Sequence, residues 1–378
     1  MGAKLNIPDG KVDIKFGDKF MWDFQQLACD QTADIFKMNP LARILIVMPT
    51  GVGKTLTVGN IINNPIVRKV LMKRYDYNVS DTLRVVFKSH RNRLLVQADR
   101  AFSGEDFVKV NHIDNWVEDR PSKNKVEIIY QTLNDKIPDQ TKVHLIIFDE
   151  SHHEACITAQ EFLETGSDYP IIGITATKDR PDQLLIKFDH IIEPISRDEA
   201  VERGLICQTD IKSIVDVSHK DKLSLAKDIL TTFSKEMGQT MIFTKTKIEA
   251  KELAQFLRGM GYQAVAILDQ PDNEVNNILD MFSEGKIKFL VNCMKIGEGV
   301  DVAGCTDVFI DRQVASYTLL NQLIGRASRI DDPRCVVWEL INPLSGKNLD
   351  TTVVVGKPKS HEIISKKNGN WVVRNMEH

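Results

Sequence analysis

ILIVMPTGVGKT, residues 44–55, joins an apolar run to a glycine-rich turn that ends in Lys54 and Thr55. This pattern predicts a buried strand that leads into a phosphate-binding loop and then into a helix. Small residues in the turn let backbone N–H groups surround phosphate oxygens, and the helix N-terminus adds the positive end of its dipole. Lys54 can reach the terminal phosphates, and the Thr55 hydroxyl can bind Mg²⁺. The candidates for nucleotide binding in this segment are Thr50, Gly51, Val52, Gly53, Lys54 and Thr55.

One position departs from the generic pattern. Met48 stands where that pattern has a glycine, so only residues 51–55 follow it. The alternative interpretation is an ordinary strand, turn and helix with a chance Gly-Lys-Thr. A second motif decides between the two.

The second motif is VHLIIFDESH, residues 143–152, an apolar strand that ends in two carboxylates. Asp149 at the end of a strand beside a phosphate loop can hold hydrated Mg²⁺. Glu150 can orient or deprotonate the attacking water, because a carboxylate bound to a metal is a poor base. Two solvated acids at a strand end are the alternative, but the pairing with the earlier loop favours a site that hydrolyses a nucleotide.

Short apolar runs recur along the 378 residues and alternate with segments of helical spacing. Such alternation predicts α/β domains with doubly wound parallel sheets. The first series of expected strands comprises residues 44–48, 85–87, 127–129, 144–148 and 171–174. The second series comprises residues 241–243, 264–268, 289–292, 308–310 and 336–340.

Two series of strands predict two domains, each of a size typical of one folding unit. We place the first at residues 1–198 and the second at residues 199–350, with a hinge near residues 197–208. Residues 351–378 contain Asn368-Gly369 between two apolar segments. That dipeptide predicts a β-hairpin, which we expect to be a small appendage on the second domain.

Composition limits the environment of the protein. Its net charge is −3, so a polyanion would be held by a local groove and not by a basic surface overall. The six cysteines show no Cys-x-x-Cys pair, which favours reduced thiols over a disulfide frame or a zinc site. His153-Glu154 lacks a second histidine at Ile157, and Asn6 excludes a myristoylation signal. We expect a cytoplasmic protein, or one of a nucleoid or viral-replication compartment, with no secretory signal, transmembrane segment or membrane partner.

From Phe20 to Arg329 the chain resembles the superfamily 2 helicases. The Asp-Glu-Ser-His box is similar to the variant in restriction-enzyme motor subunits, excision-repair helicases and phage branch-migration helicases. Trp22 replaces an arginine that is usual in the glutamine motif, and Lys178 stands where proline is frequent. The further segments that match family motifs, in order, are residues 21–25, 89–97, 130–133, 173–177, 241–244, 297–301 and 322–329.

The resemblance implies two tandem RecA-like domains with the nucleotide site in the cleft between them, and it implies ATP and Mg²⁺ as the ligands. Gln25 is similar to the glutamine that reads adenine, and Gly299 and Asp301 match a second-domain motif at the nucleotide. The residues implied in coupling hydrolysis to motion are Ser151, His152, Thr175 and Thr177.

Gln322, Arg326 and Arg329 are spaced i, i+4 and i+7, so one helix can present all three on one face. The alternative is a solvated polar stripe. The same helix is otherwise apolar, however, as expected of a helix packed at an interface. Two arginines directed at a γ-phosphate would stabilise its developing charge, a role that is worth about 10³–10⁵ in rate. We therefore expect these three residues to be catalytic.

A single nucleic-acid strand lying across both domains is also implied by the resemblance. Most of its contacts would reach phosphate or sugar, which permits movement along any sequence. The Asp-Glu-Ser-His box favours DNA over RNA. The candidate contacts are Arg91, Arg93, Gln131, Thr132, Thr244, Lys245 and Lys295.

The predicted function is an ATP-dependent translocase or helicase that moves on or remodels DNA. An RNA helicase or RNA-remodelling ATPase is the first alternative, and a nucleotide-gated DNA clamp without progressive motion is the second. Two domains leave little chain for a wedge between the strands. We therefore also expect modest unwinding, or a protein partner that supplies specificity or a wedge.

Overall fold

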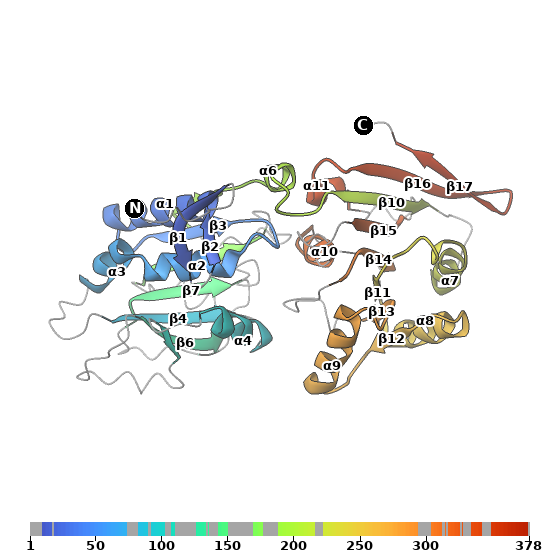
Figure 1. Ribbon diagram of the computed structural model, residues 1–378, viewed down its shortest axis with the longest axis horizontal. Helices are drawn as coiled ribbons and strands as arrows, with labels where there is room; N and C mark the ends of the chain where they lie inside the picture. The colour runs from blue at the N-terminus through green and yellow to red at the C-terminus, as the bar shows by residue number, and fades with distance from the viewer. Residues whose placement is uncertain are drawn as a thin grey trace, which may run out of the picture. The chain divides into compact units, whose positions relative to one another are not determined.

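The computed structural model describes residues 10–16, 19–73, 82–89, 92–102, 107–109, 126–133, 135, 143–149, 169–176, 188–215, 222–293, 304–311, 314, 317–325, 327, 334–341 and 349–376. The chain divides into two compact units, Met1–Ser196 and Arg197–His378. Each unit is built on one large, mainly parallel sheet (Figure 1). The predicted α/β class with parallel sheets is confirmed.

The first unit opens with an antiparallel hairpin that packs against its first two helices. Its strands are β1 (Lys11–Phe16), β2 (Lys19–Trp22), β3 (Arg43–Val47), β4 (Leu83–Ser89), β5 (Phe107–Lys109), β6 (Val126–Thr132), β7 (Leu145–Asp149), β8 (Ile171–Thr175) and β9 (His190–Ile192). Its helices are α1 (Asp23–Met38), α2 (Lys54–Asn63), α3 (Pro65–Met72) and α4 (Asn92–Ala101).

The seven-stranded sheet of the first unit has the order β5-β6-β4-β7-β8-β3-β9. Every neighbouring pair in it is parallel. The five strands expected from the apolar runs of this half are β3, β4, β6, β7 and β8. Because the strands run the same way, their C-terminal ends lie along one edge of the sheet.

The second unit contains an eight-stranded sheet of order β12-β13-β11-β14-β15-β10-β16-β17. Its strands are β10 (Thr209–Val215), β11 (Thr240–Thr244), β12 (Ala264–Ile267), β13 (Phe289–Asn292), β14 (Asp307–Asp311), β15 (Cys335–Ile341), β16 (Ser360–Lys367) and β17 (Asn370–Asn375). Its helices are α6 (Arg197–Glu202), α7 (Lys222–Phe233), α8 (Lys247–Gly259), α9 (Asp272–Ser283), α10 (Tyr317–Ile324) and α11 (Thr352–Val355). The five strands expected here are also present.

The alternation of side chains in β11 divides the core of the second unit between the two faces of its sheet. Met241 and Phe243 pack in a cluster with apolar residues of α9 and α10. Ile242 points to the other face, where it packs in a cluster with residues of α7 and α8. Both faces are therefore covered, as expected of a parallel sheet whose crossover helices lie on either side.

Local sequence signals account for the start of α8. Its N-cap, Thr246, accepts a hydrogen bond from the Glu249 amide at 3.2 Å. In return the Glu249 carboxylate accepts the Thr246 amide proton at 2.8 Å. This reciprocal capping box satisfies two amide groups that would otherwise lack partners at the helix start.

The C-terminal hairpin is part of the second sheet and not an appendage to it. Asn368 and Gly369 form the expected turn with φ of 53° and 79°, values that suit these residue types. However, β16 also pairs in parallel with β10. Ile364 on β16 is fully buried in the same core cluster as Trp338. Pairing with β10 on one side and with β17 on the other makes β16 an inner strand, so the hairpin expected as a small appendage extends the second sheet.

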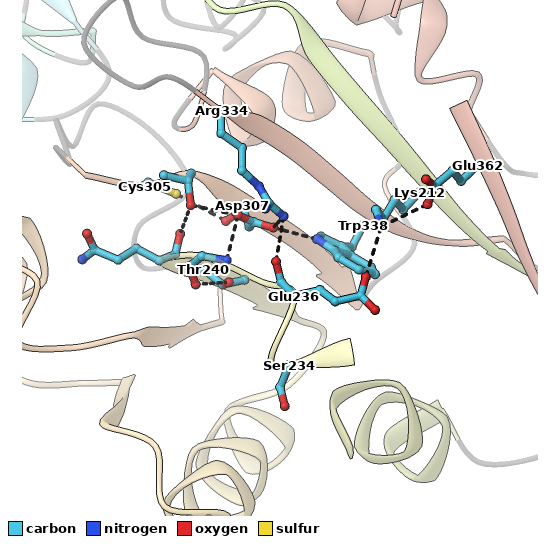
Figure 2. A network of polar contacts seen from close by, with 12 residues as sticks. Lys212, Ser234, Glu236, Thr240, Cys305, Asp307, Arg334, Trp338 and Glu362 are labelled. Atoms are coloured by element: carbon cyan, nitrogen blue, oxygen red, sulfur yellow. Dashed lines mark hydrogen bonds and ion pairs between the residues drawn. The ribbon is translucent and has the colours of Figure 1, made fainter. Parts of the chain in front are cut away.

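Asp307, the first residue of β14, is a fully buried carboxylate held by four hydrogen bonds (Figure 2). Its donors are the Gly238 amide at 3.0 Å, the Thr306 hydroxyl at 2.8 Å, Arg334 Nη2 at 3.0 Å and the Trp338 indole at 2.9 Å. A buried charge is costly unless such partners surround it. The carboxylate thereby joins the loop before β11 to the start of β14 and to β15.

None of the described helices is both long enough and apolar enough to cross a bilayer.

We expect Asp307→Ala to destabilise the second unit by more than about 1–3 kcal/mol, the cost of leaving one buried donor unpaired, here the Trp338 indole. The same change also removes an acceptor from Gly238, Thr306 and the partly exposed Arg334, which keeps its bond to the Glu236 carbonyl. Trp338→Phe removes a single donor and should cost about 1–3 kcal/mol. Urea unfolding combined with hydrogen exchange of the β14 and β15 amides measures both losses. The control is Asp280→Ala, at an exposed position of α9, which should change stability by less than about 0.5 kcal/mol. Equal stability of Asp307→Ala and this control would contradict the assigned role.

Candidate nucleotide-binding site

Three motif segments end adjacent strands of the first sheet. The order β7-β8-β3 places Asp149, Thr175 and Val47 at the ends of neighbouring strands. Val47 pairs with Thr175, and Asp149 pairs with Ile174. In open parallel sheets, ligands bind beyond the C-terminal ends of the strands. The loop that follows β3 lies at this edge.

That loop turns through two glycines in the left-handed region. Gly51 has φ of 94° and Gly53 has φ of 89°, and glycine adopts such values without the strain of a side chain. Gly53 is the N-cap of α2, which begins at Lys54. Lys54 and Thr55 are half-buried in the first helical turn. The free amide groups of this turn and the helix dipole favour an anion in front of them.

Met48 occupies its place in the loop without requiring glycine. Its side chain is fully buried, and its amide donates to the Thr175 carbonyl at 3.0 Å. Asn368 is the one non-glycine residue with positive φ in the described part of the chain, so Met48 has an ordinary backbone conformation. The chain at Met48 therefore extends the strand, and the turn begins after it.

The side chain of Gln25 connects the N-terminal hairpin to the loop. Its oxygen accepts the Trp22 amide proton at 2.9 Å. Its nitrogen donates to the Val52 carbonyl at 3.0 Å and lies 3.5 Å from the Gly53 carbonyl. Gln25 is only 2% exposed. Its side chain supports the loop through the bond to the Val52 carbonyl, and its role in reading adenine stays a prediction.

Trp22 lies next to this contact, and a lysine ammonium lies over its indole ring. Its ring stacks on Phe24 with centroids 6.3 Å apart. The Lys11 ammonium lies 3.8 Å from the indole centroid, within cation–π range, and also donates to the Phe20 carbonyl. Positive charge is thus present beside Trp22.

The described residues include two oxygen ligands suited to Mg²⁺, the Thr55 hydroxyl and the half-buried Asp149 carboxylate. Several other predicted residues lie outside the described part of the chain. These are Glu150, Ser151, His152, Thr177, Gly299, Asp301, Arg326 and Arg329. Gln322 belongs to α10, but its side chain is likewise outside the description.

The predicted nucleic-acid contacts of the first unit lie further along the same sheet edge. Gln131 and Thr132 end β6 and are half-buried. Thr132 pairs with Ser89, the last residue of β4. Arg91 lies outside the described residues, as does the side chain of Arg93.

The predicted contacts of the second unit differ in exposure. Thr244 is fully buried, and its hydroxyl donates to the Thr246 carbonyl at 2.9 Å. A contact with a ligand would require that bond to break. The next residue, Lys245, directly follows β11 and is exposed, so its side chain can contact a ligand from solvent. Lys295 lies outside the described residues.

Sequence reasoning missed Lys88, a lysine on β4 that is only 3% exposed. Its ammonium donates to the Asp135 carbonyl at 2.7 Å and to the Thr132 carbonyl at 3.4 Å. A buried lysine is rare, and the cost of burial must be offset by such bonds. The available signal was a lysine directly after the apolar run of residues 85–87.

Tyr130, on β6, fixes α4 to the first sheet. Burial raises the pKa of its phenol far above the usual range, and the nearby Asp99 charge, to which the phenol is hydrogen-bonded, raises that pKa further. The phenol therefore stays protonated and donates to Asp99 on α4. Its ring also lies 5.9 Å from that of Phe87. α4, which carries Arg93, is anchored on β6 by these contacts.

Two families match successive parts of the chain. Residues 19–180 match the family described as "Type III restriction enzyme, res subunit". Residues 221–331 match the family described as "Helicase conserved C-terminal domain". The first match contains the loop and Asp149, and the second contains α10.

One curated relative is IRC3 of Saccharomyces cerevisiae, whose name describes an ATP-dependent helicase. It is 25% identical over 348 residues, which cover 82% of this chain and 49% of that protein. The chain thus spans about half of the length of this relative.

Two solved structures share the architecture. The first is a fragment of an HsdR-type subunit of a type I restriction enzyme from Vibrio vulnificus YJ016, with a TM-score of 0.67, 20% identity, and coverage of 92% of this chain and 69% of that one. The second is the ATP-dependent Type ISP restriction-modification enzyme LlaBIII bound to DNA, with a TM-score of 0.65, 15% identity, and coverage of 94% and 32%. The predicted fold of two tandem RecA-like domains is confirmed.

We expect Gly53→Ala to weaken nucleotide binding by about tenfold or more. A Cβ at this position would lie 2.6 Å from Gln25 Nε2, and the backbone has φ of 89°. Titration with a fluorescent ATP analogue measures the loss. Gly261→Ala is a matched control, because Gly261 has φ of 88° but no atom within 4 Å of the added Cβ. It should bind nucleotide like the unmodified protein, and equal affinity of Gly53→Ala would refute this role of the loop.

Proposed function

We propose that this chain, a superfamily 2 helicase similar to restriction-enzyme motor subunits, couples ATP hydrolysis to movement along DNA. The observation that carries this proposal is the loop after β3. It turns through Gly51 and Gly53, opens directly into α2, and lies at the sheet edge where Asp149 ends β7. A strand, a turn and a helix in this arrangement provide a site for the phosphates of a nucleotide.

In the proposed site, the amides at the start of α2 and the Lys54 ammonium bind the β- and γ-phosphates. The Thr55 hydroxyl and the Asp149 carboxylate hold Mg²⁺, which neutralises charge on the phosphates. Gln25 holds the loop in its turned form through its bond to the Val52 carbonyl. Its contact with the adenine base is proposed from the resemblance, in addition to this bond.

Hydrolysis in this scheme needs residues of both units. Glu150 orients the attacking water, and Arg326 and Arg329 stabilise the charge that develops on the γ-phosphate. In the second unit, α10 packs Leu320, Leu323 and Ile324 into the core. Gln322 lies on α10, but this helix ends at Ile324, before both arginines, so their presentation on one helical face with Gln322 stays a prediction. Gly299 and Asp301 complete the nucleotide contacts from this unit.

Coupling to motion is proposed to pass through the end of β8. The Thr175 carbonyl accepts the Met48 amide proton, so the entrance of the loop is bonded directly to this strand. A shift of the loop between nucleotide states would move Thr175 and the residues after it. Ser151, His152 and Thr177 are the further residues of this proposed path.

DNA is the proposed polymer, held chiefly through its phosphates by Gln131, Thr132 and Lys245, with Arg91, Arg93 and Lys295 as further contacts. The position of Gln131 and Thr132 at the C-terminal ends of the strands supports a contact of these two residues with the polymer. Thr244 acts indirectly in this scheme, because its hydroxyl holds the chain that precedes α8.

We expect Mg²⁺-dependent ATP hydrolysis that is slow alone and strongly stimulated by nucleic acid. Lys54→Ala and Glu150→Gln should abolish turnover, and Glu150→Gln should still bind nucleotide. Arg329→Ala should lower the rate by about 10³-fold or more. Steady-state phosphate release measures all three, and Lys69→Ala, at an exposed site on α3, is the control that should keep its rate. Hydrolysis that is equally fast with and without every polynucleotide would exclude a coupled motor.

DNA should stimulate hydrolysis more than RNA of equal length and sequence, with little dependence on that sequence. Because phosphate contacts dominate, the affinity should fall steeply as salt rises from about 50 to 200 mM. Parallel titrations of ATPase rate with single-stranded DNA and RNA over this range provide the measurement. Stronger stimulation by RNA would identify an RNA-remodelling ATPase instead.

A further inference from the structure

Two hydrogen-bond donors of Thr132 point at the same oxygen. The Thr132 amide donates to Asp135 Oδ2 at 2.6 Å, and the Thr132 hydroxyl donates to that oxygen at 2.9 Å. Asp135 itself is exposed. The donors that the proposed function assigns to a nucleic-acid phosphate are thus engaged by a carboxylate of the same chain.

A carboxylate oxygen and a phosphodiester oxygen make the same demands on such donors. Each is an anionic acceptor that forms short, charge-assisted hydrogen bonds with N–H and O–H groups. Backbone N–H and threonine hydroxyl groups are frequent donors to nucleic-acid phosphates. A position that binds one of these anions can therefore bind the other.

Lys88 places a positive charge behind this position. Its ammonium is bonded to the carbonyls of both Asp135 and Thr132, and the Asp135 amide donates to the Thr132 carbonyl at 3.2 Å. The backbone that carries the two donors is thereby fixed at both residues. Because Lys88 is 3% exposed, its charge is little screened by solvent and favours an anion nearby.

Two further polar atoms at these strand ends have no partner among the described residues. The Ser89 hydroxyl and the Gln131 side-chain oxygen are both buried without a hydrogen bond. Ser89 pairs with Thr132 across the strands, and Gln131 pairs with Lys88. Buried polar groups without partners are rare. The Ser89 hydroxyl can donate to a phosphate oxygen, whereas the Gln131 oxygen is an acceptor and adds no donor to this position.

We infer that Thr132 and Lys88 form a subsite for one backbone phosphate of a nucleic acid, and that the Asp135 carboxylate occupies this subsite until a phosphate displaces it. The inference rests on the proposed function for the identity of the ligand. Asp135 then lowers the affinity for nucleic acid, because each binding event must break its two bonds to Thr132. A nucleic acid whose phosphates do not reach the subsite leaves Asp135 bonded to Thr132.

The test compares Asp135→Asn with Asp34→Asn, an exposed aspartate on α1 whose substitution changes the net charge equally. A neutral amide competes less well with phosphate than a carboxylate does. We expect Asp135→Asn to bind labelled oligodeoxythymidine about three- to tenfold more tightly, as measured by fluorescence anisotropy at about 150 mM salt. Asp34→Asn should match the unmodified protein. Affinity of Asp135→Asn no greater than that of Asp34→Asn overturns the inference.

A double-mutant cycle separates the subsite from a general effect of charge. In a Thr132→Val background only the amide remains as a donor, so the gain from Asp135→Asn should shrink. A gain of the same size in both backgrounds would show that Asp135 acts without Thr132 and would overturn the inference. Lys88→Met should weaken binding by more than Lys69→Ala does, with circular dichroism confirming that the fold persists. If Lys88→Met unfolds, the cycle at Thr132 decides alone.

The result also separates this inference from the function on which it rests. Binding of DNA by the unmodified protein without a gain in Asp135→Asn overturns the subsite and leaves the motor in place. Failure of every variant and of the unmodified protein to bind any polynucleotide overturns both.

Discussion

The parallel direction of the strands is the constraint on which the first unit depends. Seven strands that run the same way bring their C-terminal ends to one edge, although the segments concerned are far apart in the chain. For this reason alone, that edge carries loop residues 48–53, Thr175, Asp149 and Thr132. Parallel strands need crossover connections, and the helices in those connections cover the sheet faces and leave the edge open to a ligand. The chemistry proposed for the unit follows from this topology.

Much of this arrangement was predictable because its signals are local. The apolar runs of both halves form strands, and Gly51 and Gly53 adopt the left-handed conformations that a phosphate loop requires. Thr246 and Glu249 cap α8 through residues three positions apart. The Asn368-Gly369 turn also forms where the dipeptide predicts it. In each case the residues that determine the structure are neighbours in the sequence.

Other features depend on residues that are distant in the sequence. The position of β16 beside β10 brings Ser360 to Asp210 across 150 positions, and no local pattern indicates that pairing. Lys88 and Asp307 look like ordinary surface charges until their partners are known. The resemblance implies that Gln25 reads adenine, and it does not indicate that the side-chain amide of Gln25 also bonds to the Trp22 amide and the Val52 carbonyl. A polar side chain reveals its role only when the groups it bonds to are placed.

The division of the chain into two units also determines how the protein should respond to heat or denaturant. Each unit has its own core, and the buried carboxylate of Asp307 belongs to only one of them. A single cooperative transition is the behaviour of single small domains, and proteins with several domains commonly depart from it. One melting temperature would then describe neither unit. A nucleotide bound in the first unit would shift the transition of that unit by mass action, so ligand linkage could identify which step belongs to which half of the chain.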